Sequence, residues 1–267
     1  MLMSVWRSGR RRQVVAGAAA VAVIAMLAAA TWWSWFPRWR PALRDGERYG
    51  IDVSAHQGRI DWSRVATDEV DFAYVKATEG SDFIDDWFGE NWSGAQLAGI
   101  ERGAYHFFTL CTPGAPQAAN FLNVARPDPA ALAPAVDLEL AGNCRERPPR
   151  SAVMADLDAF LTAVEAGWGR PVVLYLGDDF EGRYEVREAL DRPLWLRRFL
   201  LRPRGSGVTI WQVHGYAKVD GIAGRVDLNL MRSQASRRNR SSRVSLRTTT
   251  LAFPPATNTT GGRGTLL

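Results

Sequence analysis

The sequence predicts an α/β protein: a barrel with an incomplete outer ring of helices, preceded by a long apolar helix. Two observations predict the barrel. Strand and helix patterns alternate from residue 48 to about residue 232, and the last three strands are joined by loops too short for long helices. A third observation, a charge-free run over residues 14–36, predicts the N-terminal helix.

The run over residues 14–36 would span about 34 Å as a helix, enough to cross a bilayer core. Four arginines precede it, tryptophans crowd its far end, and Pro37 ends the helix. We therefore expect a membrane anchor with the body outside the cytoplasm, either periplasmic or extracellular. Three arginines on the far flank, up to Arg44, weaken that orientation. The alternative is a cleaved signal peptide, with the small residues 28–30 as its cleavage site. Both alternatives export the body.

Charge divides the chain into three parts: residues 1–44, a body over 45–234, and a tail over 235–267. The first part has seven arginines and no acid, and the tail has six arginines and no acid. Because the whole chain carries +5, the body carries a net charge of −8. An acidic body excludes a nucleic-acid-binding face. The tail is poor in apolar residues and is predicted to be disordered.

Eight segments of the body have the apolar, β-branched and aromatic composition of buried strands. They cover residues 49–54, 72–77, 103–108, 133–140, 171–176, 194–199, 208–213 and 226–230. Between the first five and after the fifth lie segments of helical composition, at residues 61–66, 90–97, 116–124, 151–166 and 179–190. The helix over 151–166 has an apolar stripe, and Ser151 is expected to be its N-cap.

Asp137 and Glu139 lie two residues apart at the end of the fourth predicted strand. Side chains at i and i+2 of a strand leave the same face, with Cα atoms about 6.7 Å apart. Such a pair is tolerated mainly at a strand end facing a polar cleft, where one acid is protonated and the other is charged. Hydrolysis of a glycosidic bond needs this arrangement. The alternative is two solvated acids on an exposed strand.

Other polar and aromatic residues also lie at or near predicted strand ends. In barrels of this class the chemistry occurs where the parallel strands end. The acids Asp52 and Asp227 are expected to join the pair and raise the pKa of at least one member. The remaining candidates for this mouth are Lys76, Tyr105, Phe107, Tyr175, Trp195, Trp211 and Gln212.

Cys111 and Cys144 follow the third and fourth predicted strands. If these strands are parallel neighbours, both cysteines lie in loops at the same end of the sheet, and an exported protein is expected to join them in a disulfide. The alternative is two unpaired thiols. The three histidines lack close metal-ligand spacing, so we expect hydrogen-bonded structural histidines and no metal.

Several ordered segments resemble the family 25 glycoside hydrolases, the lysozymes of the muramidase type. The matching stretches cover residues 49–58, 60–62, 74–80, 103–107, 137–139, 211–212, 219–222 and 226–229. The resemblance implies an irregular TIM-like (β/α)5(β)3 barrel. It also implies cleavage of the β-1,4 bond between N-acetylmuramic acid and N-acetylglucosamine in a peptidoglycan glycan strand, without a cofactor and, we expect, by a monomer.

By position in the resemblance, Glu139 is the general acid/base and Asp137 stabilises the transition state, while Asp52 and Asp227 complete the acidic cluster. The spacing of the pair does not choose between inversion and retention. The resemblance points to retention, with the acetamido group of the substrate as nucleophile. Tyr105, Phe107, Tyr175, Trp195 and Trp211 are each expected either to stack on sugar rings or to belong to the core.

The sixth predicted strand departs from the family pattern, because Arg197 and Arg198 follow Trp195 where a small residue and a tyrosine are usual. One of these arginines is expected to change a subsite or pair with an acid. Two rival functions remain: an inactive, membrane-tethered peptidoglycan-binding module, and a hydrolase of another amino-sugar polymer such as chitin. All four acids of the cluster are present, which favours an enzyme.

Overall fold

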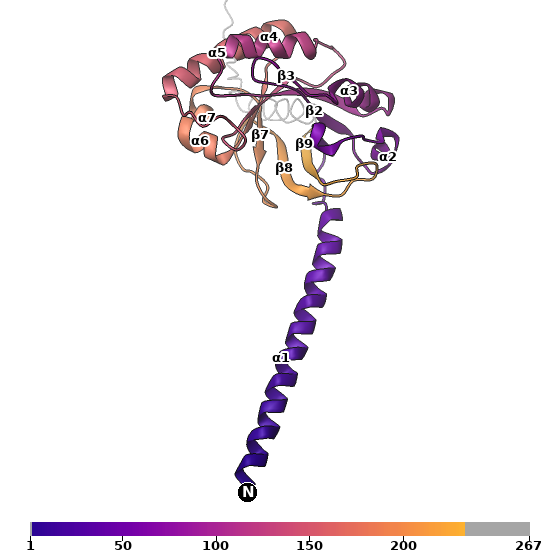
Figure 1. Cartoon of the computed structure of the whole chain (residues 1–267). Helices are drawn as coiled ribbons and strands as arrows, with labels where there is room; N and C mark the ends of the chain where they lie inside the picture. Colours follow the sequence, from indigo (N-terminus) through magenta and orange to yellow (C-terminus); the bar gives the residue numbers. More distant parts are fainter. Residues whose placement is uncertain (1, 233–267) are drawn as a thin grey trace, which may run out of the picture. The chain divides into compact units, whose positions relative to one another are not determined.

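The computed structural model describes the fold of residues 2–232, and the side chains from residue 15 onward (Figure 1). The predicted basic tail, residues 235–267, lies outside the described residues. The described body is a closed barrel of eight strands, as the sequence predicts. The division of the chain into residues 1–44, 45–234 and 235–267 remains a prediction.

The barrel closes because the first strand pairs with both the second and the last. In chain order its strands are β1 (Glu47–Val53), β2 (Phe72–Glu79), β4 (Glu101–Phe107), β5 (Ala135–Leu138), β6 (Val173–Leu176), β7 (Leu194–Arg197), β8 (Val208–Ala217) and β9 (Val226–Arg232). Strand β9 is antiparallel to β1 and β8, and the other barrel pairs are parallel. A two-residue strand, β3 (Phe83–Ile84), pairs antiparallel with β2 and was not predicted.

Helices follow the first five barrel strands, and the last three strands are joined without long helices, as predicted (Figure 1). The helices are α2 (Trp62–Thr67), α3 (Phe88–Leu97), α4 (Gly114–Val124), α5 (Arg150–Trp168), α6 (Asp178–Tyr184) and α7 (Val186–Ala189). The helix predicted over 179–190 is two helices, because Glu185 adopts a left-handed conformation, with φ 49°. The expected N-cap, Ser151, is wrong: α5 begins at Arg150, and its N-cap is Pro149, two residues before Ser151.

Apolar side chains form two separate cores, because successive residues of a strand point to opposite faces. One core fills the barrel interior and consists of Phe72, Tyr74, Ala135, Val173, Tyr175, Trp195 and Ile210. The larger core includes the helix-facing side of the strands. Gly103 makes room inside the barrel, since a Cβ there would approach the Tyr74 ring to 2.4 Å. The interior core closes the barrel below its mouth.

The N-terminal segment is helix α1 (Leu2–Trp35), followed by a single 3-10 turn, η1 (Phe36–Arg38), at the predicted Pro37. Residues 15–38 are long and apolar enough to cross a membrane, a property that anchors and signal sequences share. The segment after the helix is fixed to the barrel. The amide of Lys218 donates to the carbonyl of Pro37 at 2.8 Å, and the Tyr49 hydroxyl donates to the carbonyl of Pro41 at 2.7 Å.

The predicted disulfide is confirmed. Cys111 and Cys144 are bonded across a sequence separation of 33 residues. Cys111 follows β4 and Cys144 follows β5, and these strands are parallel neighbours. Their loops therefore emerge at the same end of the barrel, which is the end that carries the acid pair.

Candidate active site

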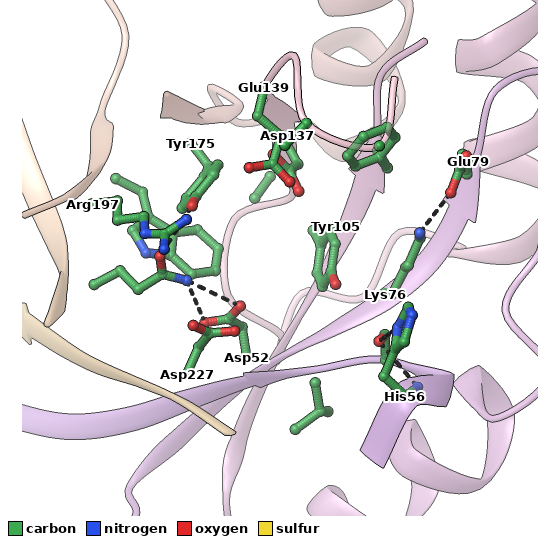
Figure 2. Close-up of a pocket in the computed structure, with 18 of the residues that line it drawn as sticks. Asp52, His56, Lys76, Glu79, Tyr105, Asp137, Glu139, Tyr175, Arg197 and Asp227 are labelled. Atoms are coloured by element: carbon green, nitrogen blue, oxygen red, sulfur yellow. Dashed lines mark hydrogen bonds and ion pairs between the residues drawn. The ribbon is translucent and has the colours of Figure 1, made fainter. Parts of the chain in front are cut away.

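A cavity of about 490 Å³ opens at the carboxyl end of the parallel strands. Figure 2 shows Asp137 and Glu139 at one end of it and Asp52 and Asp227 at the other, with Tyr105 and Tyr175 between them. The structure therefore brings the four predicted acids to one place. The other predicted residues that line the cavity are Lys76, Phe107, Trp195 and Gln212.

The acid pair is positioned by the end of β5. The strand was predicted to continue to residue 140, but it ends at Leu138, so Glu139 lies on the rim just beyond it. Two hydrogen bonds fix this turn: the Gly177 amide donates to the Leu138 carbonyl at 2.9 Å, and the Asn143 side chain donates to the Glu139 carbonyl at 3.0 Å. A Cβ on Gly177 would lie only 3.0 Å from the Glu139 Cβ. Glycine here lets Glu139 keep its place.

Both acids of the pair hold protons more tightly than usual. Burial raises the pKa of Glu139; the Arg197 guanidinium opposes the rise, and Asp179 adds to it. Burial and the nearby charges of Glu139 and Asp52 raise the pKa of Asp137 well above its ordinary value. The Oδ1 atom of Asp137 is buried and has no hydrogen-bond partner within the described part of the protein. That oxygen is available to a donor that enters the cavity.

The second acid pair comes from the register of the antiparallel strands, which places Asp52 of β1 directly opposite Asp227 of β9. Burial and repulsion from Asp227 raise the pKa of Asp52 well above its ordinary value. Asp52 is held by two amides: Asn229 Nδ2 donates to Oδ2 at 2.6 Å, and Gln212 Nε2 donates at 3.2 Å. Burial also raises the pKa of Asp227, opposed by Arg197.

Two of the predicted aromatic residues belong to the core and also line the cavity. The Tyr175 hydroxyl donates to Gln212 Oε1 at 3.0 Å, and the Trp195 indole donates to Asn229 Oδ1 at 2.8 Å. Both rings are almost fully buried, and Tyr105 is partly exposed. These bonds make a polar network that links the aromatic floor to the Asp52 carboxylate.

Two cations lie among the acids of the cavity. Lys76 donates to Glu79 at 2.7 Å, so it pairs with an acid at the mouth. Arg197, the unusual residue of β7, lines the cavity with an exposed side chain beside Tyr175 (Figure 2). This position agrees with the expectation that Arg197 changes a subsite or pairs with an acid.

The placement of Trp211 in the site is wrong. Its indole donates to the carbonyl of Arg198 at 2.7 Å, and its ring belongs to the core outside the barrel, beneath Arg202. Trp211 and Gln212 are consecutive residues of β8 and must point to opposite faces, so only one of them can face the cavity.

The sequence analysis did not name three residues, His56, Gly177 and Asn229, as site candidates, although His56 lines the cavity and the other two contact residues that line it. His56 lines the cavity and bonds Ser54 at 2.9 Å. Asn229 was noticed only as part of a matching stretch, although its place two residues after Asp227 on a strand predicts the same face. The other histidines are hydrogen-bonded structural residues, as expected; His106 contacts Thr78 at 2.7 Å and Gln117 at 3.1 Å on the helix side of β4.

Comparison with known proteins decides the family. The model of the glycosyl hydrolases family 25 matches residues 51–224, which include Asp52, Asp137 and Glu139; Asp227 lies just beyond the matched range. The chain belongs to family 25 of the glycosyl hydrolases. This family 25 enzyme is therefore a glycoside hydrolase of the muramidase type, and peptidoglycan is the polymer on which that type acts.

Three relatives place the enzyme within the family. The uncharacterized protein YegX of Escherichia coli strain K12 is 33% identical over 190 residues, 68% of each chain. Lysozyme M1 of Streptomyces globisporus is 32% identical over 212 residues, 74% of this chain and 71% of that one. The crystal structure of the bacterial lysozyme from Streptomyces coelicolor is 31% identical, with a TM-score of 0.64 over 71% of this chain and 94% of the other.

Proposed function

We propose that this enzyme cleaves the β-1,4 bond between N-acetylmuramic acid and N-acetylglucosamine in peptidoglycan, with Glu139 as general acid/base. The observation that carries this proposal is the position of Glu139 on the rim of an acidic cavity, where burial raises its pKa. A carboxyl group in such a place is protonated at a higher pH than usual and can protonate the leaving oxygen.

Asp137 is proposed to orient the acetamido group of the substrate, which acts as the nucleophile in a retaining reaction. The unpartnered, buried Oδ1 of Asp137 supports this role, because an amide N–H is the kind of donor it lacks. A negative charge on Asp137 would also stabilise the positive charge that develops at the sugar ring.

Asp52 and Asp227 are proposed to complete the acidic cluster at the other end of the cavity. Tyr105, Phe107, Lys76 and Gln212 are proposed to contact the glycan, and Tyr175 and Trp195 to form the floor beneath the sugar. Their support is that each lines the cavity. The four acids line a single cavity of about 490 Å³, which supports their acting on one bound glycan.

The enzyme is proposed to act outside the cytoplasm as a monomer anchored in the membrane by α1. The apolar stretch over residues 15–38 supports the anchor, and the disulfide supports an oxidising compartment. Cleavage of α1 as a signal peptide remains the alternative. Mass spectrometry of the N-terminus of the mature protein separates the two.

The test is mass spectrometry of the fragments released from purified cell wall, after borohydride reduction of their new ends. A muramidase leaves N-acetylmuramic acid at the reducing end, so we expect reduced muramic acid in the products of the wild type. Loss of a general acid lowers rates by about 10²–10⁴-fold, which is the expectation for Glu139→Gln. Glu146→Gln is the matched control, since this exposed acid lies on the loop after Glu139.

Three results would contradict the proposal. Near-normal digestion by Glu139→Gln would remove its assigned role. Reduced glucosamine at the new ends would mean that the enzyme cuts the other bond. Faster cleavage of chitin oligomers than of peptidoglycan would identify a different polymer. For the acetamido route, proton NMR of the first product anomer tests retention, and N-deacetylated glycan is expected to resist cleavage.

A further inference from the structure

Aromatic and aliphatic side chains are exposed on the barrel where β7 ends and β8 extends toward β9. Phe199 is 56% exposed, Leu201 is 73% exposed and Tyr216 is 56% exposed. The Phe199 and Tyr216 rings contact each other, with centroids 6.5 Å apart. We call Phe199, Leu201 and Tyr216 the apolar shoulder. Exposed apolar groups that gather in one place mark surfaces that contact another apolar phase.

The apolar shoulder is continuous with the aromatic end of α1. Phe36 stacks on Trp32 at 5.1 Å and contacts Phe199 at 6.1 Å and Tyr216 at 6.4 Å. An unbroken series of rings therefore runs from the apolar helix onto the barrel. Aromatic side chains of this kind settle at the boundary between hydrocarbon and water.

Two basic residues lie two positions along the chain from rings of this series, Arg38 from Phe36 and Lys218 from Tyr216. Arg38 directly follows Pro37, and the Lys218 amide is bonded to the Pro37 carbonyl at 2.8 Å. Both side chains are exposed and line one open hollow of about 880 Å³. Neither forms an ion pair with any residue in the described part of the chain, although acids line the same hollow. Unpaired cations close in the chain to exposed aromatics suit a surface with anionic headgroups.

We propose that the apolar shoulder inserts into the interface of an anionic phospholipid bilayer and fixes the barrel against the membrane. This inference rests on the membrane anchor in the proposed function. The turn η1 directly follows α1 and packs against the end of β8, where the Lys218 amide donates to the Pro37 carbonyl, so the contact would hold the mouth of the barrel close to the bilayer. The glycan within its reach is then the membrane-proximal part of the wall.

The experiment places an environment-sensitive probe at single sites of the full chain in nanodiscs that contain phosphatidylglycerol. Single-cysteine labelling is feasible because the native cysteines are bonded to each other. The probe is attached at Leu201→Cys, with Trp33→Cys as the membrane reference. Leu97→Cys is the matched solvent control: Leu97 is 88% exposed on α3, which packs on β2 and β4, across the barrel from β7 and β8.

We expect the probe at position 201 to shift to shorter wavelengths and to lose fluorescence to spin-labelled lipids nearly as strongly as the probe at position 33. The probe at position 97 is expected to show neither change. Adding Phe199→Ser and Tyr216→Ser should reduce the quenching at position 201. These two residues lie outside the catalytic cavity, so digestion of cell wall in detergent should stay at the wild-type rate.

A probe at position 201 that is no more quenched than the one at position 97 would overturn the proposal. So would a probe that responds to soluble peptidoglycan fragments and not to lipid, because the shoulder would then be a glycan subsite. Wall digestion in detergent is measured in parallel. Failure of the proposed hydrolase function would appear there, whatever the probe reports about the membrane.

Discussion

Removal of the disulfide tests how the two loops at the mouth of the barrel contribute to stability. The change is Cys111→Ala together with Cys144→Ala. For a sequence separation of 33 residues, the chain-entropy relation gives about 12.5 cal/mol/K, or about 3.7 kcal/mol at 25 °C. We expect the free energy of unfolding to fall by about that amount, because the unfolded chain regains the freedom that the bond removed. In a body of this size the melting temperature should fall by about 7–15 °C.

The assay is urea denaturation of the full chain in detergent, followed by tryptophan fluorescence. Wild-type protein in the presence of a reductant should match the double variant, which controls for loss of packing by the two side chains. A fall in unfolding free energy below about 1 kcal/mol would refute the loop-entropy reasoning.

Activity gives the second half of this prediction. Asp137 and Glu139 are held by backbone bonds that do not involve the disulfide: Phe108 N to Asp137 O at 3.0 Å, and Gly177 N to Leu138 O at 2.9 Å. Wall digestion per folded molecule should therefore be unchanged well below the melting temperature. A loss of activity in fully folded double variant would show that the bond positions the acids.

Three further substitutions test the site. Arg197→Ala removes a charge that lowers the pKa of Glu139, so this acid should stay protonated to higher pH. The alkaline limb of the pH profile of kcat/KM should therefore move to higher pH, and a limb that does not move would contradict this reasoning. Gly177→Ala places a Cβ 2.8 Å from Asp179 Oδ1 and 3.0 Å from the Glu139 Cβ, so Glu139 must shift. The variant should lower kcat/KM, by up to about 10²-fold, with little change in melting temperature, and normal turnover would refute the steric argument. Asn229→Ala leaves the buried Trp195 indole without its acceptor. The unfolding free energy, measured in urea, should fall by about 1–3 kcal/mol, and unchanged stability would show that the hydrogen bond contributes nothing.

Much of the fold follows from local patterns. The order of strands and helices, the closed barrel and the disulfide were all predicted, because buried strands and parallel neighbours leave clear signals in composition and spacing. Boundaries were less accurate. The strand over 133–140 is shorter than predicted and the helix over 179–190 is divided, since strand pairing and a left-handed Glu185 set those ends.

The sequence by itself determined which chemical groups the cavity contains. Asp52, Asp137 and Glu139 occur where parallel strands end, and parallel strands deliver those ends to one edge; Asp227 reaches the same edge from the amino end of the antiparallel β9. The spacing of Asp137 and Glu139 is by itself enough to predict that their side chains lie together.

Only the tertiary structure decided which residues surround the four acids in the cavity. Barrel closure sets Asp52 opposite Asp227, and it directs Gln212 inward and Trp211 outward. It also brings Asn229 against Asp52, and Gly177 against Glu139, although these residues are far apart in the sequence. Such contacts depend on register and on the face that each residue occupies. A shift of one position reverses the face, and no local pattern fixes the register of strands that lie far apart in the chain.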